Sequence, residues 1–102
     1  MPTLDDLRDD IDRVDEVLVR LLNERARRVC EIGRLKKSLG VEVYQPDREK
    51  EVLSHVRTVA CEGPLGPEAI GRLFERIIDE ARRLERRLVH DEISVGSDDG
   101  HS

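Results

Sequence analysis

The sequence predicts an all-α fold: a protomer of three helices, long, short and medium in chain order, that pairs into an intertwined homodimer. Apolar residues recur at helical spacing through three segments, and breaks containing Gly or Pro separate these segments. Charged residues make up 40% of the chain and aromatic residues only 2%, a composition typical of helical bundles. The first segment would form a helix too long for the interior of one 102-residue domain. It is therefore expected to project into a second copy.

The first expected helix covers residues 4–39 and would be roughly 54 Å long. Thr3 and Asp6 resemble a capping box at its start, and Gly40 suits its C-terminus. Gly33 is the one weak point inside it, at a cost of about 1 kcal/mol relative to Ala. The early apolar residues alternate three and four apart, as in the seam of a coiled coil. This seam comprises Leu4, Leu7, Ile11, Val14, Leu18 and Leu21.

Two shorter helices are expected to follow. Residues 41–46 indicate a loop, and Pro46 suits the first turn of a second helix. The next break contains Gly63, Pro64 and Gly66. A third helix is expected from Pro67 to about His90, with apolar residues at helical spacing.

The last residues differ in composition from the rest. Residues 91–102 are rich in Ser, Gly and Asp, so we expect a disordered acidic tail behind a domain of residues 1–90. Of the formal net charge of −5, this tail accounts for −4, because it has four acidic residues and no Lys or Arg. The near-neutral remainder argues against a general nucleic-acid-binding surface.

The cysteines and the N-terminus indicate neither a zinc site nor export from the cytoplasm. Cys30 and Cys61 are isolated from each other and from the three histidines, so zinc-site spacing is absent. Both are expected to be packed thiols rather than a disulfide. The acidic N-terminus lacks the apolar run of a leader, and no stretch approaches a membrane span. We therefore expect a cytoplasmic protein without membrane contact.

Five charged residues interrupt the apolar stripes. Arg25 and Lys36 are eleven residues apart, so they share one helix face at roughly 16 Å along the axis. Arg48 and Glu49 start the second helix, and Glu85 falls on the inward face of the third. Taken singly, each has a simple structural explanation: its stem lies on apolar surface while its charge stays in water, or it pairs with a neighbouring charge. Together they indicate a pocket, because buried charge is costly unless it is paired or liganded. Since the three cations outnumber the two carboxylates, a small dianion would complete this pocket.

Arg8 adds a geometric condition. It precedes Arg25 by seventeen residues, about 26 Å along the helix, on a face turned by about 100°. One metabolite cannot touch both in the same chain. Arg8 is therefore either a solvated surface residue or a contribution from a second copy to the site.

Three sets of segments carry a family resemblance. The first expected helix contains residues 4–8, 21–25 (Leu-Leu-Asn-Glu-Arg) and 32–36 (Ile-Gly-Arg-Leu-Lys), the second begins with residues 44–49 (Tyr-Gln-Pro-Asp-Arg-Glu), and the third contains residues 73–78 and 84–85. In this order they resemble the three helices of the all-helical (AroQ-class) chorismate mutases. The resemblance covers about residues 4–88 in the family's order. It implies a homodimer with two equivalent sites, and the [3,3] rearrangement of chorismate to prephenate on the route to Phe and Tyr, without cofactor or metal.

The resemblance also implies roles for the cations. Arg25 and Arg8 of the partner chain would hold the two substrate carboxylates, for which the planar guanidinium fork is suited. Lys36 would reach the ether oxygen and a nearby carboxylate. Arg48 would line the same wall and help to order the carboxylates.

The remaining positions carry departures from the family pattern. By resemblance, Glu49 and the backbone near Gln45 would bind the ring hydroxyl, and Glu85 would face the ether oxygen from the side opposite Lys36. Some members have Gln in place of Glu85. A carboxylate there helps only when it is protonated and donates a hydrogen bond, so turnover is expected to fall as pH rises through its ionisation. Gln45 stands where some members have an acid, and Ala81, a further substrate-binding position, where some have a hydroxyl.

Two classes of alternative stay open, one within the same family and one that is not an enzyme. Related enzymes rearrange 4-amino-4-deoxychorismate, or eliminate pyruvate from isochorismate, on the same scaffold; an ammonium substituent would favour extra acid nearby, which Gln45 does not supply. The other alternative is a non-enzymatic dimerisation or regulatory module. Such a module would not need Arg25, Lys36 and Glu85 inside.

Overall fold

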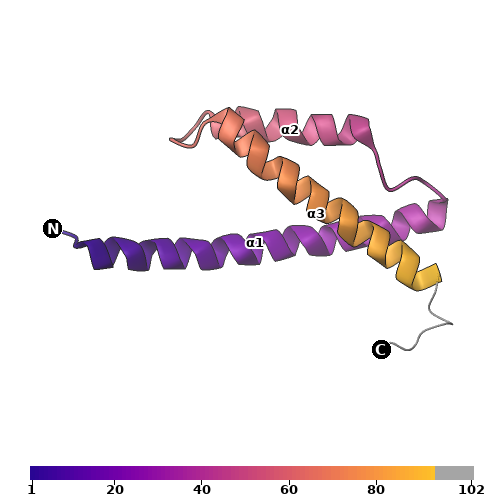
Figure 1. Cartoon of the computed structure of the whole chain (residues 1–102), viewed down its shortest axis with the longest axis horizontal. Helices are drawn as coiled ribbons and strands as arrows, with labels where there is room; N and C mark the ends of the chain where they lie inside the picture. Colours follow the sequence, from indigo (N-terminus) through magenta and orange to yellow (C-terminus); the bar gives the residue numbers. More distant parts are fainter. Residues whose placement is uncertain (94–102) are drawn as a thin grey trace.

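The computed structural model describes residues 1–93, which form three α-helices joined by two short connections (Figure 1). These are α1 (Leu4–Leu39), α2 (Pro46–Ala60) and α3 (Pro67–Ile93). The predicted long, short and medium helices are confirmed. α3 continues to Ile93, beyond the expected end near His90, because no Gly or Pro occurs before Gly96. The rest of the expected tail, residues 94–102, lies outside the described residues.

Local signals account for both ends of α1. The hydroxyl of Thr3 accepts a hydrogen bond from the Asp6 amide at 3.1 Å, and the Asp6 carboxylate accepts one from the Thr3 amide at 3.0 Å. This is the predicted capping box. At the other end, Gly40 adopts a left-handed conformation with φ 69°, and its amide donates to the carbonyls of Lys36 and Lys37. Glycine adopts this conformation without the steric cost of a Cβ atom.

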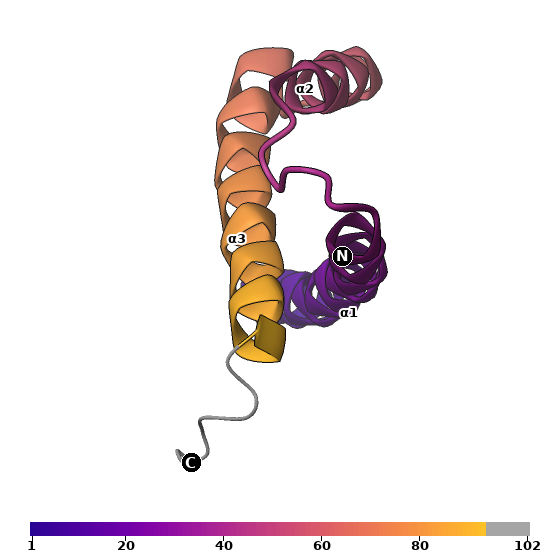
Figure 2. The same ribbon diagram turned by 90° about the vertical axis from the view of Figure 1, so that its right-hand side faces the viewer.

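α3 is the element on which the other two helices pack. α1 and α2 each contact α3 but do not pack on one another. Figure 2 shows both on the same side of α3, with the connection between them passing along that side. The apolar core of the described residues is small and consists of Val29 and Ile78. At Gly33 the two helices α1 and α3 come close, because a Cβ placed there would lie 3.4 Å from Cγ of Glu85.

The first half of α1 extends away from α3 (Figure 1). The residues of its predicted seam remain 48 to 62% exposed: Leu4, Leu7, Ile11, Val14, Leu18 and Leu21. Exposed apolar rows of this length are unusual on a monomer and are typical of a surface that another chain covers.

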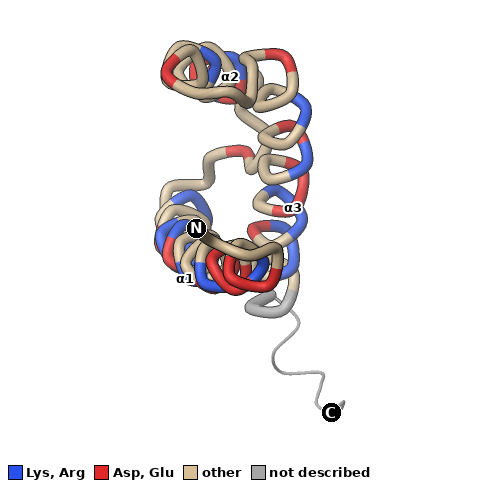
Figure 3. The backbone as a smooth tube through the Cα atoms, turned by 90° about the vertical axis from the view of Figure 1, so that its left-hand side faces the viewer, with Lys and Arg blue, Asp and Glu red and all other residues tan. Residues whose placement is uncertain are grey.

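Further apolar side chains outside this seam are also exposed, among them Leu35, Leu39 and Leu73, and charged residues of both signs surround them. Lys and Arg are interspersed with Asp and Glu along the helices (Figure 3). No helix among residues 1–93 combines the length and apolar character needed to cross a bilayer. Both cysteines are free, as predicted, but Cys61 is exposed and only Cys30 is partly buried. The prediction of a packed thiol is wrong for Cys61, because α2 ends at Ala60 and Cys61 falls in the turn beyond it.

Candidate functional site

A cavity of about 600 Å³ lies between the second half of α1, the start of α2 and the middle of α3. α3 forms one wall, and the connection between α1 and α2 contributes Val41, Val43 and Gln45. Seven of the eight residues predicted from the sequence line this cavity: Arg25, Lys36, Gln45, Arg48, Glu49, Ala81 and Glu85.

Arg25 is the half-buried cation of this cavity. Its guanidinium lies over the ring of Phe74, 5.9 Å from the centroid. Within residues 1–90 no carboxylate forms an ion pair with it. Burial lowers the pKa of Arg25, and the nearby charge of Arg48 lowers it further. A partly desolvated cation beside a second cation is a favourable place for an anion.

Lys36 and Glu85 form an ion pair between α1 and α3. The Lys36 ammonium donates to Oε1 of Glu85 at 2.9 Å and to the carbonyl of Val43, also at 2.9 Å. The two side chains are only 17% and 11% exposed. Whereas the resemblance placed the two groups on opposite sides of a substrate oxygen, they contact each other directly here. Because an ammonium has three hydrogens, one is left for a ligand oxygen.

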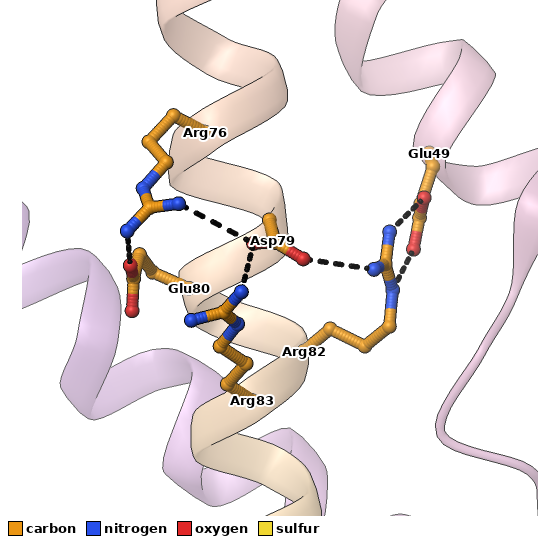
Figure 4. Close-up of polar contacts among 6 residues, drawn as sticks. All are labelled: Glu49, Arg76, Asp79, Glu80, Arg82 and Arg83. Atoms are coloured by element: carbon orange, nitrogen blue, oxygen red, sulfur yellow. Dashed lines mark hydrogen bonds and ion pairs between the residues drawn. The ribbon is translucent and has the colours of Figure 1, made fainter.

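Arg82 is a site residue that the sequence analysis missed. Its Nε donates to Oε2 of Glu49 at 3.1 Å, and its Nη2 donates to Oε1 of Glu49 at 2.8 Å. Its Nη1 donates to Asp79 at 3.2 Å (Figure 4). The hydrogen bond to Glu49 is the main reason why the pKa of Arg82 is raised. A signal was present, since Arg82 is four residues after Ile78 and three before Glu85, on the inward face of α3.

Arg48 and Arg28 lie at the rim of the cavity. Arg48 is exposed and pairs with Glu51 at 3.3 Å on its own helix. Arg28, which the sequence analysis did not single out, also lines the cavity and pairs with Glu24 at 2.7 Å. Both are long, solvent-facing side chains that a bound anion can attract, because such surface pairs contribute little energy.

Gln45 and Ala81 are less prominent. Gln45 is the residue before α2, and its side-chain Nε2 donates to the backbone carbonyl of Glu42 at 2.9 Å. Ala81 contributes only a methyl group. It lines the main cavity and also a smaller apolar pocket of about 320 Å³ between α1 and α3, next to Arg25 and Leu84.

Arg8 is the one predicted site residue that this chain does not bring to the cavity. It is exposed near the start of α1, and its nearest carboxylate is that of Asp5 at 3.9 Å. Arg8 and Arg25 both lie in α1, as expected from the sequence, so about 26 Å of helix separates them.

Comparison with known proteins gives one consistent family. Residues 7–86 match the family model described as chorismate mutase type II. The chain is 40% identical over 90 residues to a bifunctional chorismate mutase/prephenate dehydratase of Neisseria gonorrhoeae, covering 84% of this chain and 24% of that protein. It is 34% identical over 91 residues to a protein of the same description from Aquifex aeolicus, covering 86% of this chain and 25% of that protein. The chain thus spans about a quarter of the length of these bifunctional relatives.

A solved structure extends the similarity to the fold. A chorismate mutase from Thermus thermophilus superimposes with a TM-score of 0.76 at 43% identity, over 79% of this chain and 91% of that one. A chorismate mutase of Methanocaldococcus jannaschii is 26% identical over 89 residues, covering 86% of this chain and 89% of that protein.

Proposed function

The chain belongs to the chorismate mutase type II family, and on this premise we propose that it catalyses the rearrangement of chorismate to prephenate in the cavity between its three helices. The observation that carries the proposal is Arg25, a half-buried guanidinium without a carboxylate partner among residues 1–90. Chorismate carries two carboxylates, and a guanidinium binds a carboxylate through two parallel hydrogen bonds. The product lies on the route to Phe and Tyr.

The position of Lys36 supports a role at the breaking bond. When the carbon–oxygen bond of chorismate breaks, negative charge develops on the ether oxygen. The Lys36 ammonium is already oriented by Glu85 and by the Val43 carbonyl, and one hydrogen remains. A preoriented donor stabilises the developing charge more than it stabilises the ground state, which lowers the barrier. Glu85 would act by holding the ammonium at this oxygen through their ion pair.

The guanidinium groups would orient the substrate. The enolpyruvyl arm of chorismate must fold over the ring before the new bond can form. Arg25 and Arg48 on one chain, with Arg8 of the partner subunit, would hold the two carboxylates and select the folded conformer. Glu49 would accept the hydrogen bond of the ring hydroxyl. None of these steps needs a cofactor or a metal ion.

The proposal includes an intertwined homodimer. The apolar seam of α1 is exposed over residues 4–21, and covering it with a second copy would bury the row of Leu, Ile and Val side chains. The second copy would also bring its Arg8 to the cavity of the first chain, which the Arg8 of the first chain does not line. We take residues 1–90 as the catalytic domain, and a cytoplasmic location remains a prediction.

The direct test is loss of the absorbance of chorismate with purified protein. Wild type is expected to convert chorismate to prephenate, and Arg25→Ala is expected to lower kcat/KM at least about 100-fold. Arg27→Ala is the matched control, since Arg27 is exposed, pairs with Glu24 at 3.1 Å and does not line the cavity. It is expected to behave as wild type.

The same assay separates the alternatives. Turnover of isochorismate or 4-amino-4-deoxychorismate in preference to chorismate would replace the proposed reaction with a related one. Absence of turnover with all three substrates would contradict an enzyme and favour a dimerisation module.

A further inference from the structure

Arg82 binds Glu49 and also contacts two further residues, Asp79 and Tyr44. The two-point contact with Glu49 joins α3 to α2, and the contact with Asp79 lies within α3 (Figure 4). The ring of Tyr44, in the connection before α2, lies 5.3 Å from the guanidinium carbon. The Arg82 and Glu49 side chains are 23% and 24% exposed and line the cavity. The pair is therefore held by contacts from α2, from α3 and from the connection before α2.

We propose that Arg82 is a specificity-determining residue: by neutralising Glu49, it makes this end of the cavity accept a hydroxyl group and reject an ammonium group on the substrate ring. The inference rests on the proposed function, in which Glu49 receives the ring hydroxyl of chorismate.

The hydrogen-bonding capacity of Glu49 supports this role. A carboxylate offers about four lone-pair sites, and the Arg82 fork occupies one on each oxygen. The remaining sites can accept one hydrogen bond from a neutral hydroxyl. Arg82 thus leaves Glu49 able to bind a hydroxyl while cancelling its charge.

An ammonium group would meet a different electrostatic environment. It needs an unbalanced negative charge, but the charge of Glu49 is already balanced by Arg82. Arg48, the residue before Glu49, adds a further positive charge at the same wall. Removing the charge of Arg82 would leave Glu49 as an unpaired carboxylate in a partly buried site, which an ammonium would satisfy.

The neighbouring arginine offers a matched control. Asp79 also contacts Arg83 at 3.2 Å and Arg76 at 3.8 Å, so it keeps cationic partners when Arg82 is replaced. Among residues 1–90, Glu49 has no other ion-pair partner. Arg83 is 61% exposed and does not line the cavity. The same substitution at Arg82 and at Arg83 therefore separates the effect on Glu49 from a general effect on α3.

The test compares kcat/KM for chorismate and for 4-amino-4-deoxychorismate, in which an ammonium replaces the ring hydroxyl. Arg82→Met is expected to lower the ratio of chorismate to amino-substrate efficiency at least about tenfold, since one full charge next to the substituent is lost. Arg82→Gln, which keeps a hydrogen-bond donor without the charge, is expected to shift the ratio in the same direction. Arg82→Lys, which keeps the charge, is expected to stay near the wild-type ratio, as is Arg83→Met.

The outcomes distinguish failure of this inference from failure of the proposed function. An unchanged ratio in Arg82→Met and Arg82→Gln overturns the inference, and so does an equal shift in Arg83→Met; turnover of chorismate by wild type would leave the proposed function standing in either case. If Arg82→Met does not fold, as judged by its circular dichroism melt, Arg82→Gln alone decides. Failure of wild type to convert chorismate would overturn the proposed function itself.

Discussion

Lys36 on α1 and Glu85 on α3 meet at 2.9 Å although 49 residues separate them in the chain. Gly33 lies three residues before Lys36, and a Cβ placed there would be 3.4 Å from Cγ and 3.7 Å from Cα of Glu85. The residue that weakens α1 by its helix propensity is thus one at which α3 approaches α1 closely. This approach places the buried ion pair in the wall of the cavity.

The first prediction concerns the stability that depends on this ion pair. Lys36→Met is expected to lower the free energy of unfolding by roughly 1–3 kcal/mol, because Glu85 would be left in a nearly buried site without its partner. Adding Glu85→Met should recover most of that loss, since two apolar side chains need no partner. Urea unfolding at one fixed protein concentration measures both. A double variant that is less stable than Lys36→Met would contradict the prediction.

The second prediction concerns how Glu85 orients Lys36. Glu85→Gln keeps an oxygen that can accept the hydrogen bond of the ammonium, whereas Glu85→Ala removes it, so kcat is expected to stay within about tenfold of wild type in Glu85→Gln and to fall further in Glu85→Ala. Rates of chorismate turnover for the two variants and wild type provide the measurement. Equal kcat in the two variants would remove Glu85 from this role.

The third prediction concerns Gly33. A methyl group there makes an ordinary contact with Glu85, so Gly33→Ala is expected to fit and to raise the free energy of unfolding by about 1 kcal/mol through helix propensity. Gly33→Leu is expected to push α3 away, with loss of stability and of turnover, because the larger side chain would occupy the space of Glu85. Thermal melts and chorismate turnover report both effects. Equal behaviour of Ala and Leu would show that the two helices do not approach here.

The fourth prediction concerns the exposed seam of α1. Leu18→Asp is expected to shift the protein from dimer to monomer and to abolish turnover, because it places a charge in the row that the second copy would cover. Arg20→Asp introduces the same residue two positions later, at an exposed site that pairs with Glu16 at 3.6 Å, and is expected to remain dimeric. Sedimentation velocity distinguishes the two states. A wild-type protein that sediments as a monomer would refute this prediction.

The helices could be predicted from sequence because their limits are set locally. Thr3 with Asp6 starts α1, Gly40 ends it, and Pro46 and Pro67 start the next two helices. Each of these signals acts over a few residues and needs no knowledge of the tertiary structure. The end of α3 was harder to place, since no breaker occurs near His90.

The site could be predicted only in part. Helical periodicity places Arg25, Lys36 and Glu85 on inward faces, and the structure brings all three to one cavity. The partners of these residues depend on how helices distant in sequence pack, which periodicity along one helix does not specify. For this reason the Arg82–Glu49 fork, across 33 residues, and the Val43 carbonyl at Lys36 were not foreseen.

Mixed dimers test most directly the proposal that this cavity is a chorismate site completed by Arg8 of the partner subunit. Arg8→Ala and Lys36→Ala are each expected to be inactive alone. After equal amounts exchange subunits, about half of the dimers would be hybrids with one intact site each, so activity should recover to about a quarter of wild type. No recovery, with hybrids verified by native mass spectrometry, would contradict the shared site.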